Sequence, residues 1–193
     1  MNPRVLLLST VHPPGDPRIR SKIAASLASY YDVFCVLPKA KAAAGEHEIT
    51  LLSLPFFKKL TNRLLLAHPM LLWKCLRLRP RIVHIFVPEL IPAAFLFQWL
   101  GASVIYEVQE NMYKKFSIKT FNNHSLYQCA FRFFDQLARQ HFRCIFTEDA
   151  YLSEYNNLRT PRLSCTISFH YPCYLHGRHS VRQRMFRNSF TPE

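Results

Sequence analysis

The chain has 193 residues, of which 49% are hydrophobic, and its formal net charge at pH 7 is +13. This length and this apolar share fit one domain with a sizeable core and exclude a largely disordered protein. The excess of positive charge predicts an anionic partner, such as a nucleic acid, a lipid surface or a phosphorylated substrate.

The first half of the chain alternates between apolar strand-like runs and helical patterns. Residues 4–9 predict a strand, and Asp16 followed by Pro17 predicts the start of a helix that runs to about residue 30. Two further strands are expected at 32–37 and 48–54. A helix is expected over 56–78, bent or interrupted at Pro69.

The second half continues the same alternation. Residues 81–110 predict a strand, a helix from 88 to 100 and a second strand. Helices are then expected at 126–141 and 149–157, and strands at 144–147 and 163–168. This order predicts an α/β fold, a doubly wound, Rossmann-like parallel sheet in a single domain. No GxGxxG or GxxxxGK[ST] motif is present, so we expect no self-sufficient dinucleotide or ATP site.

Three carboxylates follow predicted strands. Glu89 comes after the strand at 82–86, and Glu107 and Glu110 close the next one. Open α/β sheets bind ligands at the carboxyl ends of their strands, so these residues are candidates for substrate binding. The alternative is that they cap helices or lie in solvated loops. Asp16 is expected to act mainly as a helix cap, and His84 as a hydrogen-bonded core histidine.

A basic stretch lies between residues 56 and 81, where no acidic residue occurs. Its interleaved apolar residues predict a cationic amphipathic helix that docks on anionic lipid. The alternative is an ordinary crossover helix whose apolar face covers the sheet. The candidate membrane-surface residues are Lys58, Lys59, Arg63, Lys74 and Arg77. Nucleic-acid binding is disfavoured because no helix-turn-helix, zinc finger or RNA-binding aromatic signature is present.

The cysteines and histidines predict neither a disulfide framework nor a metal site. Six cysteines are scattered without a CxxC pair or a secretion signal, which favours a reduced, cytoplasmic compartment. The longest apolar stretch, 90–106, contains interrupting residues, so we expect no membrane span and at most a peripheral position at the inner face of the cell membrane. His170, Cys173, His176 and His179 are spaced by three, which matches none of the usual zinc-ligand patterns.

Four segments, in order, resemble family 4 glycosyltransferases: HPPGDPRIRSKIAASLASYYDVFCV, IVHIFVPELIPAAFL, VIYEVQE and RCIFTEDAYLSEY. The match covers nearly all of residues 3–173. The resemblance implies a GT-B enzyme, in which two Rossmann-like domains face each other across a cleft. Residues 1–173 would form the N-terminal, acceptor-binding domain, and 174–193 a basic tail that begins the second domain.

The resemblance also implies roles for individual residues. His12, Gly15, Asp16, Arg18, Glu89 and Glu107 would bind the acceptor substrate. Gln109 stands at the position of the family's catalytic histidine, with Glu110 beside it, and Val87 replaces the aspartate expected before PEL. A glutamine can form hydrogen bonds but cannot carry a proton at neutral pH.

The function implied by the resemblance is retaining transfer of a sugar from a nucleotide-sugar to a lipid-linked or polysaccharide acceptor. No cofactor is expected beyond the nucleotide-sugar, which is a substrate. The donor site would belong to the second domain, so we expect this chain to be inactive without a donor-binding half, such as a partner subunit. The alternative is a non-catalytic protein that binds a membrane surface or an anionic ligand.

Overall fold

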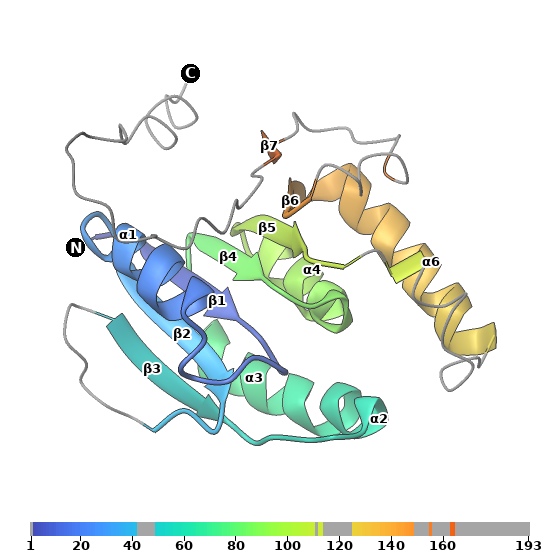
Figure 1. Cartoon of the computed structure of the whole chain (residues 1–193), viewed down its shortest axis with the longest axis horizontal. Helices are drawn as coiled ribbons and strands as arrows, with labels where there is room; N and C mark the ends of the chain where they lie inside the picture. The colour runs from blue at the N-terminus through green and yellow to red at the C-terminus, as the bar shows by residue number, and fades with distance from the viewer. Residues whose placement is uncertain are drawn as a thin grey trace, which may run out of the picture.

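The computed structural model describes residues 2–41, 49–110, 112–113, 125–148, 155 and 163–164. Their centre is a seven-stranded sheet in the order β3-β2-β1-β4-β5-β6-β7, in which every neighbouring pair is parallel (Figure 1). The strands are β1 (Arg4–Leu8), β2 (Asp32–Pro38), β3 (Ile49–Leu54), β4 (Ile82–Ile85), β5 (Ser103–Val108), β6 (Arg143–Phe146) and β7 (Leu163–Ser164). The predicted doubly wound α/β fold is confirmed.

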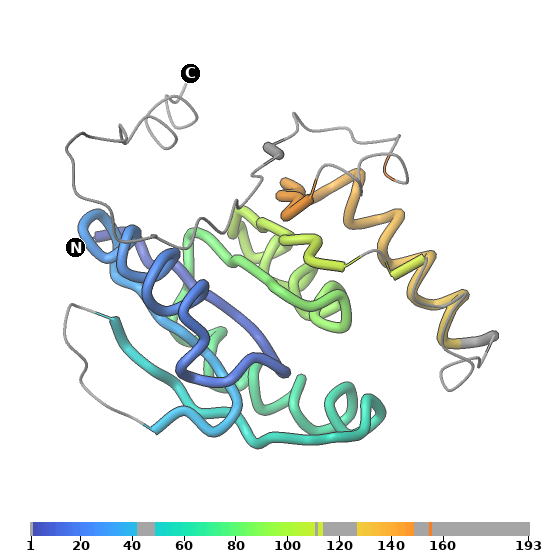
Figure 2. Tube along the Cα trace, in the orientation of Figure 1, coloured from blue at the N-terminus to red at the C-terminus, as the bar shows by residue number. Residues whose placement is uncertain are grey.

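Helical segments connect these strands. They are η1 (Arg18–Ala24), α1 (Ala25–Ala28), α2 (Leu60–Asn62), η2 (Arg63–Ala67), α3 (His68–Leu76), η3 (Pro88–Leu90), α4 (Ile91–Trp99) and α6 (Ser125–His141). Segments η1 and η2 are π-helical and η3 is a 3₁₀ turn, whereas the others are α-helical. The trace in Figure 2 shows that α6 and β3 lie at opposite sides of the molecule.

The core has two layers because side chains of each buried strand alternate between the faces of the sheet. Val5 and Leu7 of β1 pack in the layer that η1 and α1 cover. Leu6 and Leu8 pack in the opposite layer, which α3, α4 and α6 cover. Buried parallel strands are expected to be apolar throughout, which is why their short runs were recognisable in the sequence.

The helix predicted over 56–78 differs from the observed one. It begins at Leu60, because Pro55 favours extended backbone before it and Lys59 is itself extended. Pro69 does not end the helix, and the wider π-helical turn η2 immediately precedes α3, whose first turn contains this proline. A proline inside a helix removes one N–H and crowds the preceding turn, and such a position is often accompanied by a local π-helical turn like η2.

The last predicted elements are described only in part. The strand at 163–168 is seen at Leu163–Ser164. The helix predicted at 149–157 lies outside the described residues apart from Tyr155, and so does the histidine and cysteine run from His170 to His179. Among the residues that are described, no helix is long and apolar enough to cross a membrane, and no group of side chains is placed to hold a metal ion.

Candidate functional site

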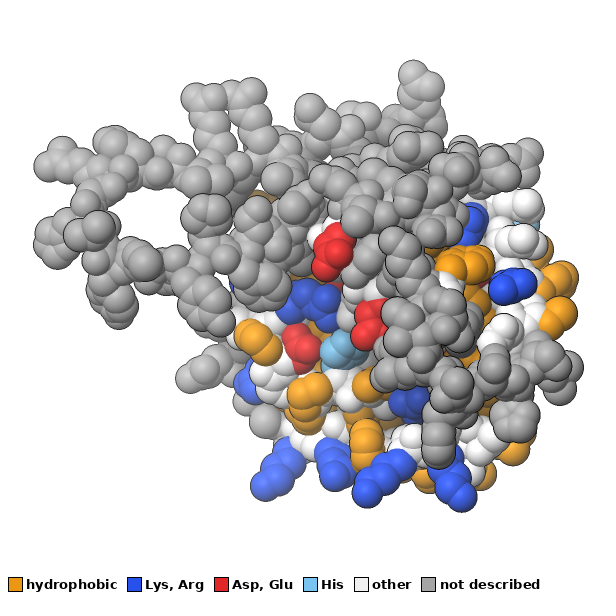
Figure 3. Space-filling model, turned by 45° about the vertical axis from the view of Figure 1, so that its right-hand side comes forward, with side chains coloured by type: hydrophobic (Ala, Val, Ile, Leu, Met, Phe, Trp, Pro, Cys, Tyr) orange, Lys and Arg blue, Asp and Glu red, His pale blue; other side chains and the backbone are white. Residues whose placement is uncertain are grey.

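The strand order reverses between β1 and β4, which makes this pair the topological switch point of the sheet. Ligands of open α/β sheets bind beyond the carboxyl ends of strands at such a point, because the connections leave in opposite directions there. The loop after β1, the end of β4 and the end of neighbouring β5 all meet at this edge. Figure 3 shows acidic, basic and histidine side chains gathered in the middle of one face of the molecule.

Five side chains form what we call the Glu107 cluster: His12, Arg18, His84, Glu107 and Gln109. Glu107 Oε1 lies 3.2 Å from Arg18 Nη1 and accepts a hydrogen bond of 3.3 Å from Gln109 Nε2. Its other oxygen, Oε2, lies 3.1 Å from His84 Nε2, which is buried without a well-aligned hydrogen bond. The cluster therefore brings residues of β4, β5, η1 and the β1 loop to one carboxylate.

The β1 loop holds Arg18 in place through Asp16. Asp16 Oδ1 accepts hydrogen bonds from the backbone N–H groups of Arg18 and Ile19, at 3.0 and 3.2 Å. This is the helix cap that the sequence predicts, and it fixes the start of η1 so that Arg18 points to the cluster. Gly15 is exposed, and an added Cβ would meet no atom within 4 Å, so no close approach requires glycine there.

His12 lies at the edge of the cluster, in contact with Ser9, Arg18 and Gln109. Its Nδ1 lies 2.7 Å from Ser9 Oγ, its Nε2 lies 3.4 Å from Arg18 Nη2, and its side chain hydrogen-bonds Gln109. Burial, and then the Arg18 charge, lower the pKa of His12 below its usual value. His12 is therefore neutral at pH 7 and can act as a base or accept a hydrogen bond.

Phe86 forms an aromatic wall beside the cluster. It follows β4, and its ring stacks on His84 with centroids 4.4 Å apart. The guanidinium carbon of Arg18 lies 6.0 Å from the Phe86 centroid, and His12 approaches the ring edge-on at 6.2 Å. The stacking orients His84, and the buried Phe86 ring joins the cluster to the core layer that contains Val5 and Leu7.

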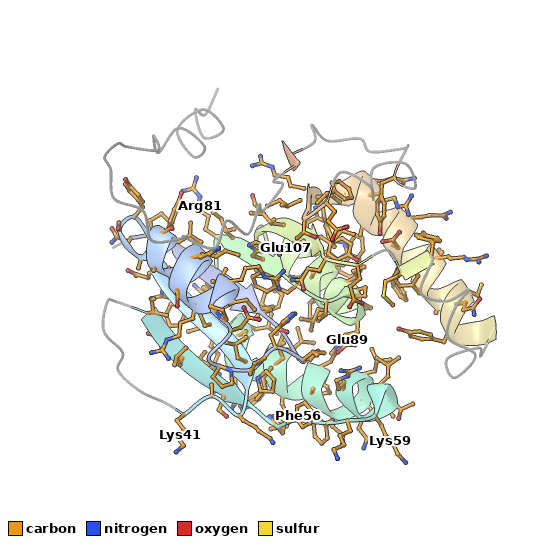
Figure 4. All side chains as sticks on the ribbon, viewed as in Figure 1. Lys41, Phe56, Lys59, Arg81, Glu89 and Glu107 are labelled. Carbon is orange, nitrogen blue, oxygen red and sulfur yellow. The ribbon has the colours of Figure 1, made fainter. Side chains whose placement is uncertain are left out.

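A second set of side chains surrounds Glu89, in η3. Thr10 Oγ1 donates a hydrogen bond to Glu89 Oε1, and Arg63 Nε lies 3.1 Å from the same oxygen. His68 lies close to the backbone of Glu89, and burial lowers its pKa. Burial raises the pKa of Glu89, although the Thr10 hydrogen bond and the Arg63 charge oppose this effect. Figure 4 shows Glu89 and Glu107 as separate positions along this edge of the structure.

Arg63 was predicted to be an exposed membrane-surface residue, but its side chain points into the protein. Its side chain is largely buried and contacts Glu89, so it is turned toward the sheet edge. Lys58, Lys59, Lys74 and Arg77 are exposed, as a surface role requires. Lys74 Nζ donates a hydrogen bond of 2.7 Å to the Ser53 carbonyl, which ties it to β3.

The structure brings together some of the predicted site residues and separates others. His12, Arg18, Glu107 and Gln109 form one cluster, whereas Glu89 lies in the second set and Glu110 is exposed beyond β5. Sequence reasoning missed the part played by His84. The register of β4 against β5 explains the contact of His84 with Glu107, because His84 pairs with Ile105 and Glu107 follows two residues later on the same strand.

A shallow, open hollow lies near this edge. It is formed by residues after β1, at the end of β2 and after β3, namely Val11, Pro13, Pro14, Pro38, Lys39 and Phe56. Lys39 has a left-handed backbone with φ of 58°, and its ammonium lies 5.0 Å from the centroid of the Phe56 ring. The hollow is mostly apolar with one cation at its wall.

Comparison with known proteins finds a solved structure of similar fold. A search against protein-family models found no match, and neither did a search of curated protein sequences. The three-dimensional fold, however, is similar to that of a glycosyltransferase of the two-domain GT-B class. The class of fold expected from the sequence is therefore confirmed, while membership of family 4 stays a prediction.

That enzyme is sucrose-phosphate synthase from Thermosynechococcus elongatus. The two structures superpose with a TM-score of 0.65 and 12% sequence identity, over 86% of this chain. The match covers 48% of the synthase, so this chain spans about half the length of its structural neighbour. At this identity the similarity shows a shared fold.

Proposed function

We propose that this chain is the N-terminal, acceptor-binding half of a retaining glycosyltransferase. The complete enzyme would transfer a sugar from a nucleotide-sugar to a lipid-linked or polysaccharide acceptor. The observation that carries the proposal is the convergence of His12, Arg18, Glu107 and Gln109 at the switch point of a sheet with a glycosyltransferase fold. The four segments that resemble family 4 glycosyltransferases support the same assignment.

The cluster has the hydrogen-bonding groups that a sugar acceptor needs. The Glu107 carboxylate can accept hydrogen bonds from sugar hydroxyls, and Gln109 can both donate and accept. Arg18 adds a cation that suits a phosphate or carboxylate on the acceptor. Neutral His12 can take the proton of the acceptor hydroxyl as this oxygen attacks the donor sugar, while the nucleoside diphosphate leaves with the bonding electrons.

Gln109 then acts by positioning His12. In the family that the sequence resembles, a histidine stands at this position, and a glutamine cannot exchange a proton at neutral pH. Here Gln109 hydrogen-bonds the neighbouring His12, which can exchange one. The Gln109 amide also reaches Glu107, so it links the proposed proton acceptor to the carboxylate that would hold the sugar.

The proposal requires a donor-binding domain, either farther along the same polypeptide or on a separate subunit. Stabilising a departing diphosphate calls for cations and backbone N–H groups aimed at it, and this is usually the largest contribution to such a reaction. The described residues contain no glycine-rich phosphate loop. We therefore expect sugar transfer only when a donor-binding half is supplied.

A sugar-binding panel tests the acceptor site. Monosaccharides, disaccharides and sugar phosphates are titrated against the purified chain, with binding followed by NMR chemical shifts. At least one compound should bind saturably and shift the signals of Arg18 and Gln109. Arg18→Gln should weaken its binding about tenfold or more, since hydrogen bonds to charged groups contribute roughly 1.5 to 3 kcal/mol. Arg20→Gln, an exposed cation on the same helical segment, should leave the affinity unchanged.

Two results would contradict the proposal. If no sugar or sugar phosphate bound the folded chain, or if Arg18→Gln bound as well as the parent, the acceptor site would be wrong. Uridine, guanosine and adenosine diphosphate sugars are tested in parallel with a transfer assay. Turnover by the chain alone would overturn the requirement for a separate donor-binding half.

A non-catalytic protein that binds an anionic ligand is the alternative function. It is favoured by Gln109, which cannot carry a proton, and by the net charge of +13. This alternative predicts that Arg18 is required for binding an anionic ligand and that no sugar transfer occurs when donor-binding proteins are added. The glycosyltransferase proposal predicts that His12→Gln lowers the turnover number and changes its pH profile, with little change in acceptor affinity.

A further inference from the structure

The segment η2–α3 exposes large apolar side chains on its outward face. Leu65, Leu66, Met70 and Trp73 expose 73%, 50%, 41% and 67% of their surfaces. They lie close together in the chain, between residues 65 and 73, and all four side chains face solvent. We call these four residues the apolar ridge.

The apolar ridge does not contribute to the core. The inward face of the same segment presents Ala67, Leu71 and Cys75, which are fully or almost fully buried in the layer against the sheet. The outward face of a surface helix is normally polar. Contiguous exposed apolar residues of this kind mark an interaction site more often than chance exposure does.

Positive charge surrounds the apolar ridge. Lys58 and Lys59 are exposed just before α2, and the guanidinium of exposed Arg77 lies over Trp73, 4.2 Å from the ring centroid. Lys41, Phe56 and Lys59 lie along the same lower edge in Figure 4, and Figure 3 shows a row of Lys and Arg side chains along the lower edge of its view. None of these cations has an acidic partner among the described residues.

We propose that the apolar ridge and its surrounding cations dock this protein on an anionic lipid bilayer. Leu65, Leu66, Met70 and Trp73 would enter the boundary between headgroups and acyl chains, and Lys58, Lys59 and Arg77 would contact lipid phosphates. Trp suits this position because its ring is apolar and its indole N–H can stay hydrated. A helix lying in the interface needs an apolar face with basic flanks, and both are present here.

The combination of charge and exposed apolar surface selects the bilayer among anionic partners. A nucleic acid would use the cations, but it has no acyl layer to receive leucine and methionine side chains. An acidic protein surface would leave those side chains without an apolar counterpart unless it offered a groove. The docking surface is separate from the Glu107 cluster, so this inference does not depend on the proposed function.

Vesicle co-sedimentation tests the docking surface. The chain is mixed with vesicles of phosphatidylcholine alone, or with vesicles in which about one third of the lipid is phosphatidylglycerol. Binding is expected to the anionic vesicles and to weaken with added salt. Lys58→Gln with Lys59→Gln should lower the partition coefficient by about fivefold for each charge removed. Leu66→Ser with Trp73→Ser should lower it by about tenfold or more, since each side chain loses the free energy of its burial in lipid.

Matched control variants separate docking from general charge and folding effects. Arg20→Gln with Lys22→Gln removes two cations from η1, on the opposite face of the sheet, and Tyr30→Ser removes an exposed aromatic residue near the end of α1. Both controls should bind anionic vesicles almost as well as the parent. In a Trp99→Phe background, which removes the other exposed tryptophan, Trp73 fluorescence gives a second measurement, because its emission should shift to the blue only with anionic vesicles.

Several outcomes would overturn the inference. Equal binding to neutral and anionic vesicles would remove the role of the cations. Full binding by the Leu66→Ser and Trp73→Ser variant would remove the role of the ridge. A failure to bind vesicles, together with binding of RNA or formation of a dimer that these substitutions abolish, would assign the surface to a different partner.

Discussion

Two carboxylate and arginine pairs in this molecule have different surroundings. Asp135 and Arg139, four residues apart in α6, are joined by hydrogen bonds of 2.7 and 2.9 Å from Arg139 Nη2 and Nε to Asp135 Oδ2. Tyr113 and Tyr155 also donate to Asp135, at 2.8 and 3.2 Å. Glu107 and Arg18 lie 3.2 Å apart, and the other contacts of Glu107 are 3.1 and 3.3 Å.

The difference lies in how completely the two carboxylates are hydrogen-bonded, and it agrees with a structural role for Asp135 and the binding role proposed for Glu107. Asp135 is fully buried, and its Oδ2 accepts three hydrogen bonds of 2.7 to 2.9 Å, while the ring centroid of Tyr155 lies 3.8 Å from the Arg139 guanidinium carbon. This network links α6 to residues far away in the chain. Glu107 and His84 are also buried, but the contacts of Glu107 are 3.1 to 3.3 Å long and His84 Nε2 has no well-aligned hydrogen bond, so the polar atoms of this cluster are paired less completely.

The largest stability effect is expected at Asp135. Asp135→Asn should lower the free energy of unfolding by about 3 to 5 kcal/mol, because it leaves the buried Arg139 charge without its counter-ion. Urea denaturation followed by circular dichroism measures this change. Asp32→Asn, at the start of β2, is the control and should change the free energy by about 0.5 kcal/mol or less. Equal losses for the two variants would refute the structural role of the network.

A smaller stability effect is expected at Glu107. Glu107→Gln should cost about 1 to 2 kcal/mol, since the amide oxygen can still accept a hydrogen bond and the contacts it replaces are long. Sugar binding should nevertheless be lost, because the carboxylate would hold the sugar hydroxyls. The same denaturation assay and the sugar titration together give both values. A stability loss as large as that of Asp135→Asn would place Glu107 in a closed structural network instead.

The sequence predicted the sheet and its switch-point loops because both depend on local patterns. Short apolar runs such as 82–86 are typical of buried parallel strands, and Asp16 before Pro17 is a local helix-start signal. The Asp135 network was not predictable in the same way. The network joins Asp135 and Arg139 of α6 to Tyr113 and Tyr155, which lie outside this helix. No sequence spacing relates the two tyrosines to the helix, so their contacts appear only in the folded chain.

The sequence also did not predict which side chains of the helical segment 60–76 point toward the sheet. A regular period would place cations of this segment on predictable sides, but the π-helical turn at Arg63–Ala67 changes the phase between the residues before it and those after it. Arg63, at the start of this turn, points inward to Glu89, whereas Lys58 and Lys59 precede the helix and are exposed. The contact of His84 with Glu107 likewise depends on the register of β4 against β5.

The smallest expected effect is on how the free energy of unfolding changes with pH, and it arises from histidines near the strand ends. Burial lowers the pKa of both His12 and His68, and Arg18 lowers that of His12 further. The unfolded chain, with histidine pKa values near about 6.5, therefore binds more protons than the folded one just below that pH. The stability contribution of these neutral histidines is present above about pH 6.5 and is lost as the pH falls below it.

Glu89 acts in the opposite direction, because burial raises its pKa in the folded state. Its contribution is present below the unfolded pKa and is lost as the pH rises through the folded value. In a Glu89→Gln background, denaturation between about pH 7.5 and about pH 5.5 should therefore show a steeper loss of stability with acid. Adding His12→Gln and His68→Gln should flatten this slope, whereas His141→Gln, an exposed position on α6, should not. An unchanged slope in the double histidine variant would trace the pH dependence to another part of the molecule and remove the distinction between the two regions.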